Sequence, residues 1–348
     1  MGESPSTALE VIEFQAGECG RAGSLLYERI LDGVAADMQA GGITADVLAG
    51  TDDDPFGSAL ALRLLGAVHR IVLEGGAPAL AALYPSAGGD AAAGDPVPPF
   101  LATLEERRAE VVAGLAAGVQ TNEVGRSAVL AGGYAEVAAA TQLPLRVLEV
   151  GASAGLNLRF DHYAYDTGVV VSGPRDSPVR FAGVWEGTAP ALPHEFEVVE
   201  RRGCDRNPVD PTTREGQLTL LAYVWPDQLD RIERLRAAIE VAQRVPVEID
   251  QADAVRWVAS QLARTVPGAT TVVVHSIVLQ YLPPDARRRL QATIETAGRS
   301  ATRDAPLGWL RMEPAGTRAE LRLTMWPRGE ERLLGSAGYH GSPIWWGA

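Results

Sequence analysis

The stretch "LRVLEVGASAGLNL", Leu145–Leu158, predicts where the main sheet of this protein begins. Its first part, Leu145–Val150, has the length and apolar character of a buried β-strand. Glycines follow at positions 151 and 155, and glycine lets the backbone turn sharply and come close to a ligand. A strand, a glycine-rich turn and a helix start together indicate an α/β fold with a ligand site where the strand ends.

The sequence differs in kind on the two sides of Leu145. Upstream, apolar residues recur at helical spacing, as in "SLLYERILDGVAADM", for which Ser24 is the expected cap. Downstream, strand-like runs alternate with helical ones, which is typical of a largely parallel sheet. The predicted strands cover residues 145–150, 195–204, 245–253, 270–278, 306–314 and 320–327.

We therefore predict two domains. A helical N-terminal domain covers residues 1–142, and a Rossmann-like, doubly wound, mostly parallel sheet covers residues 143–348. Residues 164–194 interrupt the second domain as a β-rich insertion. A helix is expected directly after the glycine turn, over "GLNLRFDHYAY".

Composition and charge limit the classes of function. Apolar residues make up 46% of the 348 residues and charged residues 22%, as in ordinary globular proteins. The net charge is -13, of which -12 falls in residues 1–125, so nucleic acid is a disfavoured partner. The first residues do not show the basic region and apolar run typical of a secretory leader, and no run of 18 apolar residues occurs, so neither a leader nor a membrane span is expected. We expect a cytoplasmic protein without a membrane partner.

Lysine is absent, and all 31 basic residues are arginine. This excludes chemistry that needs a lysine amine, including Schiff bases, pyridoxal phosphate enzymes and Walker-type phosphate binding. Two cysteines and five widely separated histidines do not form a metal-binding pattern, so no metal site is expected.

Gly151-Ala152-Ser153-Ala154-Gly155 matches two patterns that imply different chemistry. One is G-x-S-x-G, the turn that exposes the nucleophilic serine of α/β-hydrolases. Ser153 would then be the nucleophile, with His340 as base and either Asp285 or Asp304 as the acid. The predicted helical region upstream lacks the earlier strands and the oxyanion loop that such a fold requires.

The other pattern is E-x-G-x-G-x-G, and the stretch resembles this loop of S-adenosylmethionine-dependent methyltransferases of class I. Glu149 favours this interpretation, because a buried carboxylate without a partner costs several kcal/mol and a cofactor would supply the partner. The resemblance implies that Gly151, Ser153 and Gly155 form the cofactor loop, whose free N–H groups face the ligand. Ser153 replaces a glycine, which requires a negative φ or a slightly different turn.

Later stretches keep the order of the methyltransferase motifs. "RRGCDRNPVD" resembles the second motif, which implies that Asp205 accepts hydrogen bonds from the ribose hydroxyls. "IDQADAV" resembles the third motif, which implies that Asp253 and Ala254 meet the adenine. Asn157 would add a polar contact to the cofactor. The interval from Gly155 to Asp205 is much longer than one helix and a turn, so material is inserted there.

The whole chain also resembles a bacterial family catalogued as a domain of unknown function. The blocks that carry this resemblance are "LEVGASAGLNL", "GCDRNP", "VWPDQ" and "WLRMEP". This resemblance covers most of the chain and implies no activity, whereas the methyltransferase resemblance covers about residues 143–315.

Three polar residues at the predicted carboxyl ends of later strands are the catalytic candidates. His275 ends the fourth predicted strand of the second domain, and a neutral imidazole there could remove a proton or touch the cofactor. Glu313 would either contact the substrate or form a structural ion pair with Arg311 on the same strand, and Tyr281, in the loop that follows His275, would orient the substrate. The sequence thus predicts a methyltransferase that uses S-adenosylmethionine and acts on a small molecule. The alternatives are a catalytically silent cofactor-binding or interaction protein and, third, a serine hydrolase.

Overall fold

The computed structural model describes residues 5–50 and 54–347. The chain divides into two compact units, one helical and one α/β. The helical unit comprises Met1–Thr121 with Thr213–Glu233, and the α/β unit comprises Asn122–Thr212 with Arg234–Ala348.

The helical unit packs its helices around a core that α4 crosses. Nearly every residue of α4 is buried, as its apolar run predicts. Ser24 caps α2 as expected, accepting a hydrogen bond from the amide of Tyr27. The elements are α1 (Ala8–Arg21), α2 (Leu25–Gln39), α3 (Ile43–Leu48), α4 (Leu60–Leu73), α5 (Pro78–Ala81), the 3₁₀ helix η1 (Pro85–Ala87), α6 (Val97–Glu106), α7 (Arg108–Leu115) and α9 (Arg214–Ala222).

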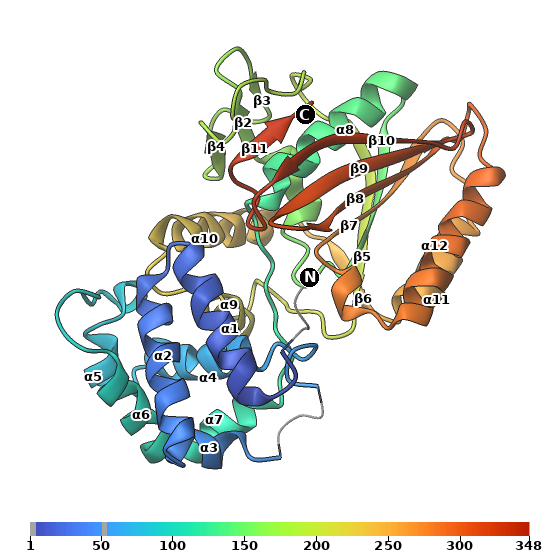
Figure 1. Ribbon diagram of the computed structural model, residues 1–348. Helices are drawn as coiled ribbons and strands as arrows, with labels where there is room; N and C mark the ends of the chain where they lie inside the picture. Colours follow the sequence, from blue (N-terminus) through green and yellow to red (C-terminus); the bar gives the residue numbers. More distant parts are fainter. Residues whose placement is uncertain (1–4, 51–53, 348) are drawn as a thin grey trace. The chain divides into compact units, whose positions relative to one another are not determined.

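The α/β unit contains an eight-stranded sheet in the order β11-β10-β9-β8-β7-β1-β5-β6 (Figure 1). The five strands from β8 to β6 are parallel, and β9, β10 and β11 continue the sheet as antiparallel strands. The strands are β1 (Leu145–Val150), β5 (Val198–Asp205), β6 (Glu248–Gln251), β7 (Thr270–Ser276), β8 (Leu307–Ala315), β9 (Arg318–Trp326), β10 (Glu330–Ala337) and β11 (Ile344–Trp346).

Helices cover both faces of this sheet. On β8, Leu310 lies against Gly133 of α8 (Arg126–Thr141). Its neighbour Trp309 belongs to the apolar cluster of α11 (Ala254–Leu262) and α12 (Pro284–Arg299). Successive side chains of a strand point to opposite faces, so α8 packs on one face and α11 with α12 on the other. This explains why all six residues of β1 are buried.

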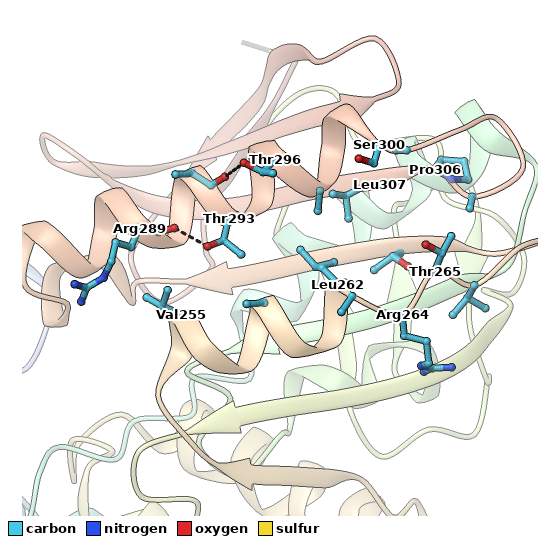
Figure 2. Close-up of a pocket in the computed structure, with 18 residues that line it drawn as sticks. Val255, Leu262, Arg264, Thr265, Arg289, Thr293, Thr296, Ser300, Pro306 and Leu307 are labelled. Atoms are coloured by element: carbon cyan, nitrogen blue, oxygen red, sulfur yellow. Dashed lines mark hydrogen bonds between the residues drawn. The ribbon is translucent and has the colours of Figure 1, made fainter.

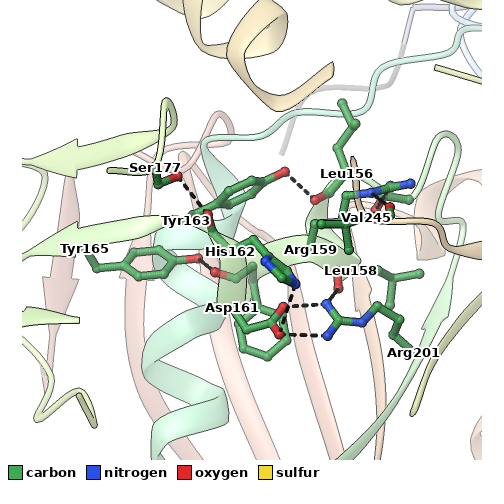
Figure 3. Close-up of polar contacts among 12 residues, drawn as sticks. Leu156, Leu158, Arg159, Asp161, His162, Tyr163, Tyr165, Ser177, Arg201 and Val245 are labelled. Atoms are coloured by element: carbon green, nitrogen blue, oxygen red, sulfur yellow. Dashed lines mark hydrogen bonds and ion pairs between the residues drawn. The ribbon is translucent and has the colours of Figure 1, made fainter. Parts of the chain in front are cut away.

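The predicted β-rich stretch at 164–194 contains a separate three-stranded sheet. It has the order β3-β2-β4 and comprises β2 (Ala164–Asp166), β3 (Val171–Ser172) and β4 (Arg180–Ala182). Two buried tyrosines in this part of the chain donate hydrogen bonds to carbonyls in or next to the preceding 3₁₀ helix η2 (Asn157–His162): Tyr163 to Leu156 at 2.6 Å and Tyr165 to Phe160 at 2.8 Å (Figure 3). Their hydroxyls thus hold the insertion to the segment that follows the glycine turn.

Three features differ from the sequence expectations. The segment after the glycine turn is the six-residue 3₁₀ helix η2, whose Asn157 and Asp161 side chains bond to Ser127 and Arg201, and the chain then enters the insertion. The division between units falls after Thr121, after Thr212 and inside α10 (Leu229–Arg244), whereas the predicted boundary was residue 142. The antiparallel strands β10 and β11 were not predicted.

Among the described residues, no helix is both long and apolar enough to cross a membrane.

Candidate functional site at the carboxyl edge of the parallel strands

The glycine turn lies at the carboxyl end of β1, between the ends of β5 and β7. Gly151 and Gly155 have φ values of 69° and 65°, which side chains rarely adopt. A Cβ on Gly151 would lie 2.6 Å from Val278, and one on Gly155 would lie 2.8 Å from Ile249. Close packing and backbone conformation therefore both require glycine at these two positions.

Ser153 has a φ of 51°, so the requirement for a negative φ is not met. The serine occupies the left-handed region, and its amide donates a 2.9 Å hydrogen bond to Asp205 Oδ2. This bond offsets part of the strain. A positive φ suits both a nucleophile elbow and a glycine position of a cofactor loop, so it does not decide between them.

The triad partners expected for Ser153 lie elsewhere in the unit. Asp304 precedes β8 and so lies at the amino edge of the parallel strands, one strand length from Ser153. Asp285 is exposed in the first turn of α12 and forms ion pairs with Arg288 and Arg289. The fold brings neither aspartate to the serine.

Most amides of the glycine turn are already bonded within the protein. Gly151 and Ala152 both donate to the carbonyl of Cys204, and Gly155 donates to Ala152. Leu156 donates to Asn122 Oδ1 at 2.9 Å. The expectation that free N–H groups of this turn face a ligand is therefore wrong for these amides.

Glu149 is the most buried carboxyl group at this edge. It is 3% exposed, and its Oε2 atom has no hydrogen-bond partner among the described residues. The pKa of Glu149 is raised to about 8, mainly by burial and also by the nearby Asp205, whereas Arg126 and Arg159 act in the opposite direction. An orphaned buried oxygen of this kind is rare in folded proteins and calls for a partner.

The two arginines near Glu149 are used to hold backbone carbonyls. Arg126 donates to the carbonyls of Ser276 and Tyr339, both at 3.1 Å. Arg159 is buried and donates to the carbonyls of Gly155 and Val245, both at 2.8 Å. These cations brace the loops around the edge.

The segment Asn122–Ser127 was not identified from the sequence, yet it forms one side of the site. Ser127 donates to Asn157 Oδ1 at 2.6 Å, so this oxygen, expected to meet the cofactor, already accepts a bond from the protein. Gly125 lies against His340, where a Cβ would come within 2.2 Å of the carbonyl. The signal in the sequence is weak, because a short polar run between two helical stretches is typical of an ordinary loop.

The other predicted cofactor residues lie at the same edge with different exposure. Asp205 is half-buried, and its Oδ1 accepts from the amide of Asn207 while Oδ2 accepts from Ser153. Each carboxylate oxygen has a second lone pair, so Asp205 retains capacity for a ligand. Asp253 is exposed and caps α11 by accepting from the amide of Arg256, and Ala254 is the first residue of that helix.

His275 is buried, with both ring nitrogens engaged. Trp309 Nε1 can only donate, so Nε2 of His275 accepts this 3.0 Å bond and Nδ1–H donates to Glu313 at 2.6 Å. The ring is therefore neutral, and this geometry leaves no lone pair to take a proton from a substrate. The catalytic role of His275 stays a prediction that a rearrangement would have to support.

Glu313 holds the loop after β7. Its carboxylate accepts from the amides of Val278 and Leu279 as well as from His275. The loop contains Ile277 at a φ of 55°, an unusual conformation for a β-branched residue. Tyr281 ends the short 3₁₀ helix η3 (Leu279–Tyr281) and is 46% exposed, so it is open to a substrate.

Glu149 and His275 point to opposite faces of the sheet. Glu149 pairs with Val274 in the parallel register, so the next residue, His275, points the other way. Asp205 shares the face of Glu149, because Glu149 pairs with Gly203 two residues before it. Glu149 and Asp205 thus lie on the α8 face, and the predicted catalytic pair His275 and Glu313 lies on the α11–α12 face.

A cavity of 730 Å³ lies along α11 and α12 and reaches the first residues of β7 and β8 (Figure 2). Its apolar lining includes Val255, Leu262 and Leu307. Thr293 and Thr296 donate their hydroxyls to helix carbonyls and so offer little polarity. Among the described residues that line this cavity, none is a predicted cofactor-binding or catalytic residue. The cavity and the carboxyl-edge site are therefore separate features.

No group of three or more potential metal ligands occurs among residues 5–50 and 54–347.

Comparison with known proteins identifies the family. The family model described as "Uncharacterized protein conserved in bacteria (DUF2332)" matches residues 10–346. The chain belongs to this family. No curated protein and no solved structure matches the chain. The family membership agrees with the resemblance of the whole sequence, and it assigns no reaction to the carboxyl-edge site.

Proposed function

We propose that this protein binds S-adenosylmethionine at the carboxyl edge of its parallel strands and transfers the methyl group to a small molecule. The observation that carries the proposal is the orphaned Oε2 atom of Glu149, on the same face and edge as Asp205. Two carboxyl groups with unused acceptor capacity suit a ligand that is rich in hydroxyl and amino donors, as a nucleoside linked to an amino acid is.

The strand order supports a ligand at this place. From β1 the chain proceeds outward to β5 and β6 on one side and then returns to β7 and β8 on the other. In open parallel sheets, ligands bind outside the carboxyl ends at such a switch point. Here the switch lies between β1 and β7, where Gly151 packs against Val278.

The residues at the carboxyl edge would act by holding the methyl donor and aligning it with the acceptor. A bound sulfonium supplies the methyl group and leaves as a thioether, while the acceptor provides the electron pair and its proton passes to solvent or to a base. Such an in-line displacement depends mainly on orientation. Asp205 would orient the donor, and the loop held by Glu313 would place Tyr281 beside the acceptor.

A cofactor-binding protein without transferase activity is the second candidate. The observation that favours it is the geometry of His275, whose two ring nitrogens bond to Trp309 and Glu313. A protein of this kind would bind the same ligand at the same edge and transfer nothing.

Calorimetric titration with S-adenosylmethionine tests the binding part of the proposal. The intact protein should bind, and Asp205→Asn should weaken binding at least tenfold, because a ligand hydroxyl loses a charged acceptor worth about 1.5–3 kcal/mol. Asp304→Asn, an exposed carboxyl-to-amide change at the amino edge, is the matched control and should bind normally. Absence of binding in the intact protein, or equal affinity in both variants, would contradict the proposal. Release of S-adenosylhomocysteine in the presence of candidate acceptors separates the transferase from the silent binder.

A further inference from the structure

The environment of Glu149 has a consequence for how any ligand enters this edge. The side chain is 3% exposed, and the described residues give its Oε2 no hydrogen bond. A carboxylate in such a place loses its hydration without replacement, whereas a protonated carboxyl loses much less. The buried geometry by itself favours the neutral form.

The charged and titratable groups around Glu149 come from each element that packs against it. Arg126 and Tyr134 belong to α8, Arg159 and Tyr163 to η2 and its end, and Asp205 to β5. Tyr134 and Tyr163 are buried, and burial raises the pKa of both hydroxyls, so they stay neutral.

Two of these groups are cations, and both have other partners. Arg126 donates to two carbonyls, and Arg159 donates to the carbonyls of Ala154, Gly155 and Val245. The nearby carboxyl of Asp205 opposes a second negative charge. Burial together with Asp205 outweighs the two arginines, and the pKa of Glu149 is about 8 in consequence.

We propose that Glu149 holds a proton while the edge is empty and releases it when the ligand enters, so that ligand binding and proton release are one coupled event. This inference rests on the proposed function, since it requires a ligand that offers a donor group to Glu149. A hydroxyl or ammonium of the ligand would take the place of the missing partner of Oε2 and stabilise the carboxylate. The carboxyl proton passes to the buffer, and no other bond is made or broken.

The coupling predicts a specific pH dependence of affinity. Below about pH 8 the ligand must displace a proton, so affinity should rise by up to tenfold for each unit of pH, and above this pH it should level off. Glu149→Gln cannot ionise, and its affinity should lack this part of the dependence.

Calorimetry in two buffers with different ionisation enthalpies measures the proton directly. With S-adenosylhomocysteine as the probe at pH 7, the intact protein should release close to one proton for each ligand bound. Glu149→Gln should release only what the ligand itself contributes. Glu295→Gln is the matched control, since Glu295 lies on α12, where it accepts a hydrogen bond from the exposed Gln291, and it should behave as the intact protein.

Each outcome has a defined meaning. Binding with no proton exchange beyond that of Glu149→Gln would overturn the coupling and leave the proposed function in place. Absence of binding would overturn both. If Glu149→Gln does not fold, infrared spectra of the ligand-free protein still decide: a carboxylic acid band of one buried group should disappear between pH 7 and 9. Its absence at pH 6 would also overturn the coupling.

Discussion

Glu149 should make the stability of the α/β unit depend on pH in an unusual direction. An unfolded glutamate titrates at about pH 4.3, and burial raises the pKa of Glu149 to about 8. Between these values the folded protein binds more protons than the unfolded chain. The stability linked to Glu149 is therefore fully present below about pH 4.3 and is lost as pH rises towards 8.

Glu149→Gln removes this dependence. We expect its free energy of unfolding to lie near that of the natural protein at pH 5 and to exceed it by about 4 kcal/mol at pH 9. Urea unfolding at both pH values measures the difference, with Glu295→Gln as control. Parallel pH profiles for natural protein and Glu149→Gln would show that the carboxyl is ionised throughout.

At the level of single residues, the sequence indicated that Glu149 is a site residue, but it did not indicate which residues surround it. A glutamate at the end of an apolar strand is visible in "LRVLEV" because burial and charge conflict there. Arg159 and Asn122 are ordinary polar residues in sequence. Arg159 donates to the carbonyl of Val245, and Asn122 accepts from the amide of Leu156. These partners lie far away in the chain, so no local sequence pattern predicts the two bonds.

At the element scale, the turn after β1 should tolerate no side chain at Gly151. Alanine there would be strained by a φ of 69° and would also place a Cβ 2.6 Å from Val278. Gly168 has a φ of 81° with open space around it, so Gly168→Ala isolates the backbone strain. We expect Gly168→Ala to cost about 1 kcal/mol and Gly151→Ala to cost roughly 1–3 kcal/mol more.

Denaturant midpoints compare the two substitutions, and titration with S-adenosylmethionine shows whether the turn still serves the ligand. Only Gly151→Ala should weaken binding, because only its turn adjoins the loop after β7. Equal costs for the two substitutions would mean that Val278 yields freely and that the two loops are not coupled by packing.

Some of the strands could be predicted from the pattern of apolar residues, and others could not. Runs of apolar and β-branched residues predicted β1, β7, β8 and β9 close to their observed bounds. Strands β10 and β11 lie in a stretch broken by glycines and prolines, and they form by pairing with β9 and with each other. Helix η2 stays short because a long-range set of bonds replaces helical ones, including the bidentate pair between Arg201 and Asp161 at 2.5 and 2.7 Å (Figure 3).

At the scale of the whole molecule, the α/β class and the bacterial family were predictable from the sequence, and the division of the chain was not. Helix α8 precedes the first strand and looks like part of the helical region, but it covers the sheet. Segment Thr213–Glu233 lies late in the chain and joins the helical unit, where Asp227 bonds to Ser24 at 2.7 Å. Such assignments depend on contacts between distant segments, which composition and motif order do not reveal.

A crystal structure with S-adenosylhomocysteine would show whether a ligand occupies the carboxyl edge beside Glu149. We expect the nucleoside against Asp205 and a donor atom of the ligand within hydrogen-bond distance of Glu149 Oε2. A ligand found instead in the cavity between α11 and α12, with Glu149 still unpartnered, would contradict it.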